Sequence, residues 1–120
     1  MDLTVLARSG EPSPGAAFDT PTYCIPALAV AASGRVIAAW DVRADWRDLP
    51  GDFDIVLRHS DDHGRSWSPP RPLRSHEPGH GFGDASLTVD PASGRILCWY
   101  VGSTGRSFFS AEAGPEGDGL

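Results

Sequence analysis

Side chains that could bind a metal or take part in catalysis are concentrated in the segment Ser60-Asp61-Asp62-His63-Gly64-Arg65-Ser66-Trp67. Its adjacent aspartates could open a calcium loop, but the acidic ligands that such a loop needs further along are missing. Asp62 can instead accept hydrogen bonds from the backbone amides of its own turn, and Gly64 can adopt a positive φ. Trp67 can fold back over the hairpin as an apolar plug. The spacing therefore predicts a compact structural turn, here called the 60–67 turn.

The histidines and cysteines do not form a metal-binding pattern. No ligand spacing connects the four histidines, which are His59, His63, His76 and His80. Two cysteines, Cys24 and Cys98, make neither a disulfide framework nor a zinc site, and we expect two reduced, partly buried thiols. We therefore expect neither a metal nor any other cofactor.

Charge and length narrow the class of protein. The chain has 120 residues and a net charge of −6, which fits at most one domain and disfavours nucleic acid as a partner. No run of about 18 apolar residues predicts a membrane span. The first residues lack the basic start and apolar block of a signal peptide. By default this predicts a cytoplasmic protein, or a secreted one if the natural N-terminus lies further upstream.

The elements that must position any functional side chain are short strands. The chain contains 14 glycines and 11 prolines. No stretch of a dozen residues keeps the apolar period of a helix. Alternating or apolar runs predict strands at about 26–31, 35–42, 53–59, 70–74, 85–90, 95–102 and, weakly, 106–111. Turn signals separate them at Ser33-Gly34, Pro50-Gly51, Asp62-His63-Gly64, Pro78-Gly79 and Ser93-Gly94. The chain is therefore predicted to be all-β, with antiparallel meanders.

An internal repeat extends this prediction. Residues 28–37 and 87–97 both read strand, short turn, Ser-Gly-Arg, strand, with an offset of about 60 residues. Four short strands in such a repeat have the form of a propeller blade. We expect about two blades, at about 22–75 and 82–111, followed by a frayed tail at 111–120.

Three further motifs accompany the 60–67 turn, which itself matches the Asp-box S-x-D-x-G-x-[ST]-W of sialidases and related propellers. Tyr23-Cys24-Ile25-Pro26-Ala27-Leu28 resembles the sialidase opening Y-R-I-P-A-L, and residues 48–58 resemble the segment that follows it. Residues 81–87, GFGDASL, resemble the family's G-F-[GS]-D-P-S-L. Over about residues 3–102 the chain resembles the N-terminal third of a bacterial-type exo-α-sialidase (neuraminidase). Such an enzyme is a six-bladed β-propeller that removes terminal sialic acid from glycans.

The resemblance implies roles for individual residues. Asp48 matches the catalytic acid/base aspartate, which protonates the leaving oxygen and later activates water. Arg43 matches an arginine that contacts the sugar near its 4-hydroxyl, and Asp84 matches an aspartate lining the pocket. The Asp-box residues Ser60, Asp62, Gly64, Ser66 and Trp67 are implied to be structural. The implied partner is a sialylated glycan or sialic acid.

Simpler interpretations of the same residues stay open. Asp48 could be a loop aspartate that merely starts the Pro50-Gly51 turn. Asp45 and Asp52 are nearby competitors for the acid role. Arg43 could pair with Asp41 or Asp45 at a surface, and Asp84 could cap the turn before its strand. Three aromatics could line the pocket, although their two-residue period is more typical of a core; they are Trp40, Trp46 and Phe82.

Two departures from the family pattern bear on activity. Cys24 stands where the family has an arginine of the triad that grips the sialic-acid carboxylate, and a thiol cannot form the two parallel bonds of a guanidinium. The family's tyrosine nucleophile, its partner glutamate and the other two arginines lie in later blades, which this chain lacks. Tyr23 and Tyr100 do not match the nucleophile. We therefore expect this chain alone to be inactive, with a degenerate sugar-binding propeller or a structural Asp-box protein as alternatives.

Overall fold

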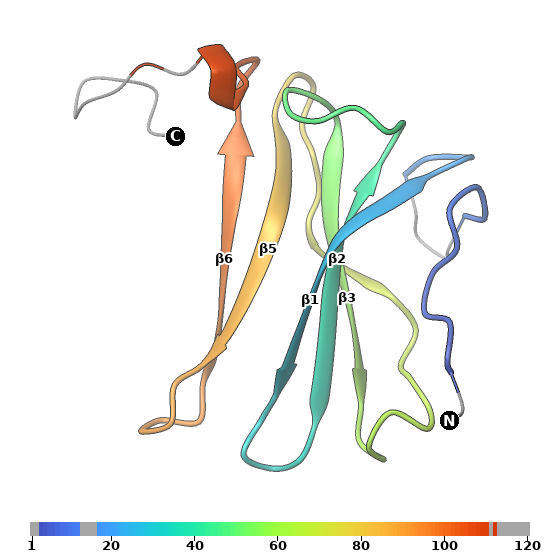
Figure 1. Cartoon of the computed structure of the whole chain (residues 1–120), viewed down its shortest axis with the longest axis vertical. Helices are drawn as coiled ribbons and strands as arrows, with labels where there is room; N and C mark the ends of the chain where they lie inside the picture. Colours follow the sequence, from blue (N-terminus) through green and yellow to red (C-terminus); the bar gives the residue numbers. More distant parts are fainter. Residues whose placement is uncertain (1–2, 13–16, 111, 113–120) are drawn as a thin grey trace.

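Six antiparallel strands form two sheets in the structure, a computed structural model that describes residues 3–12, 17–110 and 112 (Figure 1). The strands are β1 Thr22–Val30, β2 Val36–Arg43, β3 Phe53–Ser60, β4 Arg71–Arg74, β5 Gly81–Val89 and β6 Ile96–Ser103. A single turn of 3-10 helix, η1, covers Phe108–Ser110. Among the described residues no helix is long and apolar enough to cross a membrane.

The first sheet has the order β1-β2-β3-β4 and is organised around its two central strands. β2 and β3 pair without interruption from Val36 opposite Ser60 to Arg43 opposite Phe53. The hairpin between β1 and β2 closes at Gly34, whose φ of 86° only glycine adopts without strain. Gly64, Gly79 and Gly94 also have positive φ, so four of the five predicted turn signals supply left-handed backbone.

The second sheet is the hairpin β5–β6, which packs on one face of the first. Ala39, Ile55 and Leu57 on that face meet Phe82 and Ala85 of β5 in a shared apolar core. Burial of these side chains holds the two sheets together. The all-β, antiparallel prediction is confirmed, with a four-stranded sheet followed by a two-stranded one.

The opposite face of the first sheet is covered by the N-terminal segment. Ala38, Trp40, Val42 and Val56 form a second core there, against side chains of Leu6, Ala7, Phe18, Tyr23 and Trp67. Figure 1 shows this segment on the far side of β1–β3 from β5–β6. The Arg58 guanidinium fixes it by donating a 2.9 Å hydrogen bond to the Leu6 carbonyl.

The sequence repeat corresponds to a repeated backbone irregularity. In β1 the pairing register shifts between Cys24 and Ala27, and in β5 it shifts between Gly83 and Ser86, an offset of 59 residues at both ends. Each shift is a β-bulge in which two residues face one on the partner strand. The first of those two residues has positive φ in both bulges, 48° at Ile25 and 59° at Asp84. The two hairpins are therefore built on the same backbone plan.

Three expectations about strand limits were inaccurate. β1 and β5 each begin four residues earlier than predicted, because the bulge accommodates the Pro26 region and the glycines before Asp84 within paired strands. The seventh strand, predicted at 106–111, is wrong for its described part, where Phe108–Ser110 form η1. Serine hydroxyls bond the local backbone there and compete with strand pairing. The predicted frayed tail, 111–120, lies outside the described residues except for residue 112.

Candidate functional site

The candidate site lies at the end of the first sheet where β2 ends and β1, β3 and β5 begin. Arg43 is the last residue of β2, and its side chain is only 6% exposed. The guanidinium lies over the ring of Phe53, with 4.3 Å from Cζ to the ring centroid. Of its five N–H groups, four donate hydrogen bonds within this site. Arg43 is thus a fixed, buried cation with little solvent-exposed surface.

Three carboxylates surround that cation. Asp41 is fully buried, and its Oδ2 lies 2.8 Å from Arg43 Nη2. Asp48 Oδ1 is 3.4 Å from Nη1, and Asp84 Oδ1 is 3.9 Å from Nη2. The side chains of Asp48 and Asp84 are 81% and 46% exposed. Two carboxylates therefore reach solvent above the buried pair of Asp41 and Arg43.

Burial changes the ionisation of Asp41. Desolvation raises the pKa of this carboxyl above the usual range of an aspartate, and the bond and charge of Arg43 oppose that rise. The Asp84 backbone amide also donates a 3.0 Å hydrogen bond to Asp41 Oδ1. From the sequence, Asp41 was considered only as a surface partner of Arg43. The sequence analysis therefore missed Asp41 as a buried residue of the site. The signal was a charged residue between Trp40 and Val42 in an apolar central strand, since a fully buried carboxylate must be paired.

The loop 44–52 holds Asp48 and its two competitors. Asp48 Oδ1 accepts a 3.0 Å hydrogen bond from the Leu49 amide in addition to its bond with Arg43. Asp45 instead accepts from the Arg47 amide at 2.8 Å and pairs with the Arg47 guanidinium at 3.5 Å. Residues of this loop and Phe53 line a small hollow of about 150 Å³. The geometry thus separates Asp48, which joins the Arg43 cluster, from Asp45, which binds within its own loop.

Glycines bring β5 close to this loop and to the buried pair. A Cβ on Gly81 would lie 2.0 Å from the Gly51 carbonyl oxygen. A Cβ on Gly83 would lie 3.0 Å from Asp41 Oδ2. Only a residue without a side chain allows this approach, which places the next residue, Asp84, beside Arg43.

Cys24 lies on the face of β1 that Asp41 shares on β2. It pairs directly with Asp41, and residues directly opposite on antiparallel strands point to the same face. The thiol is free and half-buried. Because β1 is the edge strand, Cys24 also borders an apolar hollow of about 480 Å³ beside the N-terminal segment. By the 59-residue offset its equivalent in β5 is Gly83.

The aromatic candidates divide between core and surface. Trp40 and Phe82 are 5% and 4% exposed and belong to the two apolar cores. Trp46, in the loop beside Asp48, is 81% exposed. Core packing was the interpretation that their spacing favoured, and it applies to the first two.

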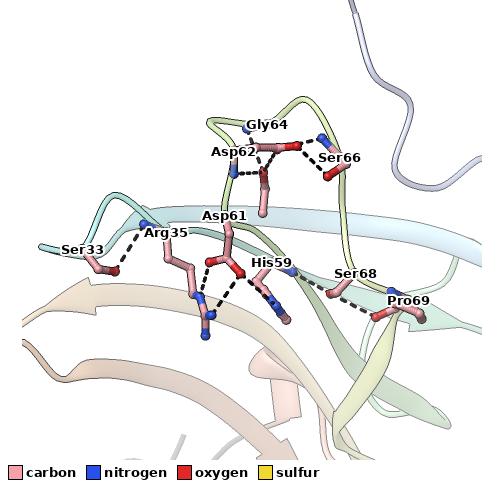
Figure 2. Close-up of polar contacts among 10 residues, drawn as sticks. Ser33, Arg35, His59, Asp61, Asp62, Gly64, Ser66, Ser68 and Pro69 are labelled. Carbon is pink, nitrogen blue, oxygen red and sulfur yellow. Dashed lines mark hydrogen bonds and ion pairs between the residues drawn. The ribbon is translucent and has the colours of Figure 1, made fainter.

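The 60–67 turn lies at the other end of β3 and is held by its own side chains (Figure 2). Ser60 Oγ accepts from the Gly64 amide and donates to Asp62 Oδ1, both at 2.8 Å. Asp62 accepts from the Ser66 amide at 2.8 Å and from the Ser66 hydroxyl at 2.6 Å. Trp67 Nε1 donates to the Gly64 carbonyl at 3.0 Å. The bonds that Asp62 accepts from Ser66 and Ser60 lower its pKa, with the Ser66 hydroxyl as the largest cause.

The neighbouring hairpin is tied to this turn. Arg35 donates two hydrogen bonds to Asp61, at 2.6 and 3.0 Å, which joins the β1–β2 turn to the 60–67 turn (Figure 2). The Arg35 bond lowers the pKa of Asp61. Within the part of the chain that the structure describes, no group of three or more histidine, cysteine, aspartate or glutamate side chains could hold a metal ion.

Comparison with known proteins finds similarity to sialidases. No protein-family profile matches the chain. A sialidase of Micromonospora viridifaciens is 33% identical over 119 residues, which cover 97% of this chain and 17% of that protein. A mutant NanB sialidase from Streptococcus pneumoniae superposes with a TM-score of 0.65 and 23% identity over 73% of this chain and 17% of that one. The predicted resemblance is confirmed: the chain is sialidase-like in sequence, and its strands have the fold of part of a sialidase propeller.

Proposed function

We propose that this chain carries the acid/base side of a sialidase active site, in a protein that removes terminal sialic acids from glycoconjugates. The observation that supports it is the meeting of Asp48, Asp84 and Arg43 at one end of the strands, in a chain of sialidase-like sequence. The chain spans only 17% of the length of its sialidase relatives. Other parts of a complete protein would supply the remaining catalytic groups.

The exposure of Asp48 supports the proposed acid/base role. A glycosidase uses one carboxyl group to protonate the leaving oxygen, and the same group then removes a proton from the attacking water. Asp48 is well exposed, so both the leaving group and water can reach it. Its contact with Arg43 restrains the carboxylate from one side and leaves the other oxygen, Oδ2, available.

Arg43 and Asp84 would shape the pocket in different ways. With four N–H groups already donated, Arg43 acts mainly by holding the carboxylates, and it offers the sugar little surface. Asp84 is half-exposed and can accept hydrogen bonds from sugar hydroxyls or an N-acetyl amide. We propose Asp84 as the polar contact from this region to the substrate.

The test of this function uses a propeller completed with the remaining blades of a close sialidase relative. Asp48→Asn should reduce kcat far more for natural glycosides than for substrates with an activated phenol leaving group, because good leaving groups need little protonation. Asp45→Asn and Asp52→Asn are matched controls in the same loop and should have small effects. Equal losses on both substrate types would show that Asp48 is not the acid, and a large selective loss in either control would transfer the role.

A second candidate function is a sugar-binding propeller without catalysis. The observation favouring it is Cys24, which occupies the face of Asp41 at the position implied for a carboxylate-binding arginine. In the completed propeller, saturable binding of sialic acid without turnover on either natural or activated substrates would support this alternative. Turnover on activated substrates would support the enzyme.

A further inference from the structure

We propose that Asp41 is a positioning residue that fixes both Arg43 and the Asp84 backbone, and so sets the distance between the two exposed carboxylates of the site. The role in catalysis rests on the proposed function; the positioning itself does not. Asp41 is fully buried, so it acts through its neighbours and not by touching a substrate.

Both oxygens of the Asp41 carboxylate accept hydrogen bonds, and their donors belong to different sheets. Oδ2 accepts from Arg43 Nη2 at 2.8 Å and from Nε at 3.3 Å, within the first sheet. Oδ1 accepts from the Asp84 amide at 3.0 Å, across the gap to the second sheet. One buried carboxylate therefore connects the two sheets at the point where the candidate site is formed.

The bond to Asp84 stabilises an unusual backbone. Asp84 has a φ of 59°, a conformation that costs energy for a residue with a side chain. The hydrogen bond from its amide to Asp41 offsets that cost and fixes the peptide. The equivalent residue of the first hairpin, Ile25, has the same sign of φ at 48°, so the bulge sets the conformation and Asp41 adds the anchor.

The bond to Arg43 sets which nitrogen faces which carboxylate. With Nε and one Nη2 hydrogen directed at Asp41, the planar guanidinium can rotate little. Nη1 is then left facing Asp48, and the second Nη2 hydrogen is left on the side of Asp84. Without the anion of Asp41, Arg43 would be held only by the more exposed partners above it.

The surroundings of Asp41 are crowded on the side of β5. Gly83 packs directly against its Oδ2, where even a methyl group would be crowded. The groups that face it from the elements packed around it are Arg43 on its own strand, Cys24 on β1, Ile55 on β3 and Asp84 on β5, with Asp48 beyond the guanidinium.

The test uses NMR on a propeller completed with the remaining blades of a close sialidase relative, because the isolated chain is expected to associate. In the folded protein the Asp84 amide should exchange with solvent at least about a hundredfold more slowly than an exposed amide. On acidification, the Asp84 amide and Arg43 Nε–H signals should move together with one midpoint, because both bond the same carboxylate. Burial raises the pKa of Asp41, so this midpoint should lie above the ordinary range of an aspartate.

Two variants separate positioning from general stability. Asp41→Asn should abolish the shared titration step while the Asn oxygen still accepts from the Asp84 amide. Asp54→Asn is the matched control, since Asp54 is a buried aspartate on β3 that binds His76 at 2.7 Å, outside the Arg43 cluster. This control should leave the shared step in place.

Three outcomes would overturn the proposal: an unprotected Asp84 amide in the folded chain, different midpoints for the two signals, or a shared step that persists in Asp41→Asn. The first two need no variant, so they decide the matter even if Asp41→Asn does not fold. None of these measurements involves sialic acid, so they stand apart from the proposed activity. In a completed propeller, Asp41→Asn should lower kcat/KM at least about tenfold, with Asp54→Asn close to the parent.

Discussion

The charges around Arg43 do not balance, and this gives position 24 its importance. One cation faces three carboxylates, Asp41, Asp48 and Asp84, so with all of them ionised the cluster is net negative. A sugar that carries a carboxylate is repelled by such a cluster unless further cations are supplied. An arginine at position 24 would add one on the face that Asp41 occupies.

We therefore predict that Cys24→Arg, made in a completed propeller, raises kcat/KM at least about tenfold. A bidentate bond to a carboxylate contributes about 1.5–3 kcal/mol, which corresponds to roughly 10- to 150-fold. Steady-state kinetics on a sialoside would measure it. Cys98→Arg is a control, because Cys98 packs against the core between the sheets, away from Arg43. If Cys24→Arg gives no gain, the residue does not face the substrate pocket.

Acid stability should depend on the 60–67 turn. The pKa of Asp62 is lowered in the folded state, so its contribution to stability is complete above the pKa of the unfolded chain, about 4, and is lost as pH falls below that. Urea unfolding between about pH 7 and about pH 3 should show a smaller acid loss for Asp62→Asn than for the parent.

Asp61→Asn provides a matched comparison, because its pKa is also lowered but by the exposed Arg35. Salt at about 1 M should screen that ion pair and reduce the effect of Asp61→Asn. The effect of Asp62→Asn should survive, since its partners are neutral hydroxyl and amide groups. A salt-sensitive Asp62 effect would contradict this account of the turn.

At the level of elements, the chain's turns and strands were predictable, and the bulges were not. The alternating runs in β2, β3 and β6 gave their limits to within one residue. The starts of β1 and β5 were missed because Pro26 and the glycines of β5 read as breaks, although a bulge includes them in paired strands. The resemblance brought Asp48, Arg43 and Asp84 to attention, but the buried role of Asp41 required knowing that β5 approaches it.

That approach depends on glycine, which gives an element-scale prediction. Gly81→Ala should lower the free energy of unfolding by more than about 1 kcal/mol, because its Cβ would meet the Gly51 backbone at 2.0 Å and neither strand nor loop can yield cheaply. Gly79→Ala is the control: it has φ 74° but nothing within 4 Å, so only backbone strain of about 1 kcal/mol applies. Denaturant unfolding would compare them. A smaller loss at Gly81 than at Gly79 would contradict close packing of β5 on the loop.

At the level of the whole molecule, large apolar side chains remain exposed on β1 and on β6 in the described chain. Leu28 and Val30 are 65% and 55% exposed on the β1 side, and Leu97 and Trp99 are 43% and 65% exposed on the outer side of β6. Blades of a propeller bury such side chains against their neighbours. The chain by itself leaves them open to water.

We accordingly predict that the isolated chain associates in a concentration-dependent way, or unfolds over a broad range. Sedimentation analysis at micromolar concentrations would measure this. Replacing Leu97 and Trp99 by serine should reduce association, because it removes apolar surface from the outer face of β6. Phe109→Ser is a control, since Phe109 is 95% exposed but lies in η1, outside the sheets. A monomer with a sharp, cooperative melt would contradict the prediction.

The repeated bulge has a consequence for how a site on this scaffold changes. Ile25 and Asp84 occupy equivalent positions in the two bulges. Both have positive φ at the same point of the first strand of their hairpin. The backbone of the bulge fixes where this residue lies, and the side chain at that position determines the chemistry. The position in β5 carries the Asp84 carboxylate, and the position in β1 carries the aliphatic side chain of Ile25. A ring of such units would offer one interchangeable position per unit around a common centre, so recognition can be rewritten one residue at a time without rebuilding a strand.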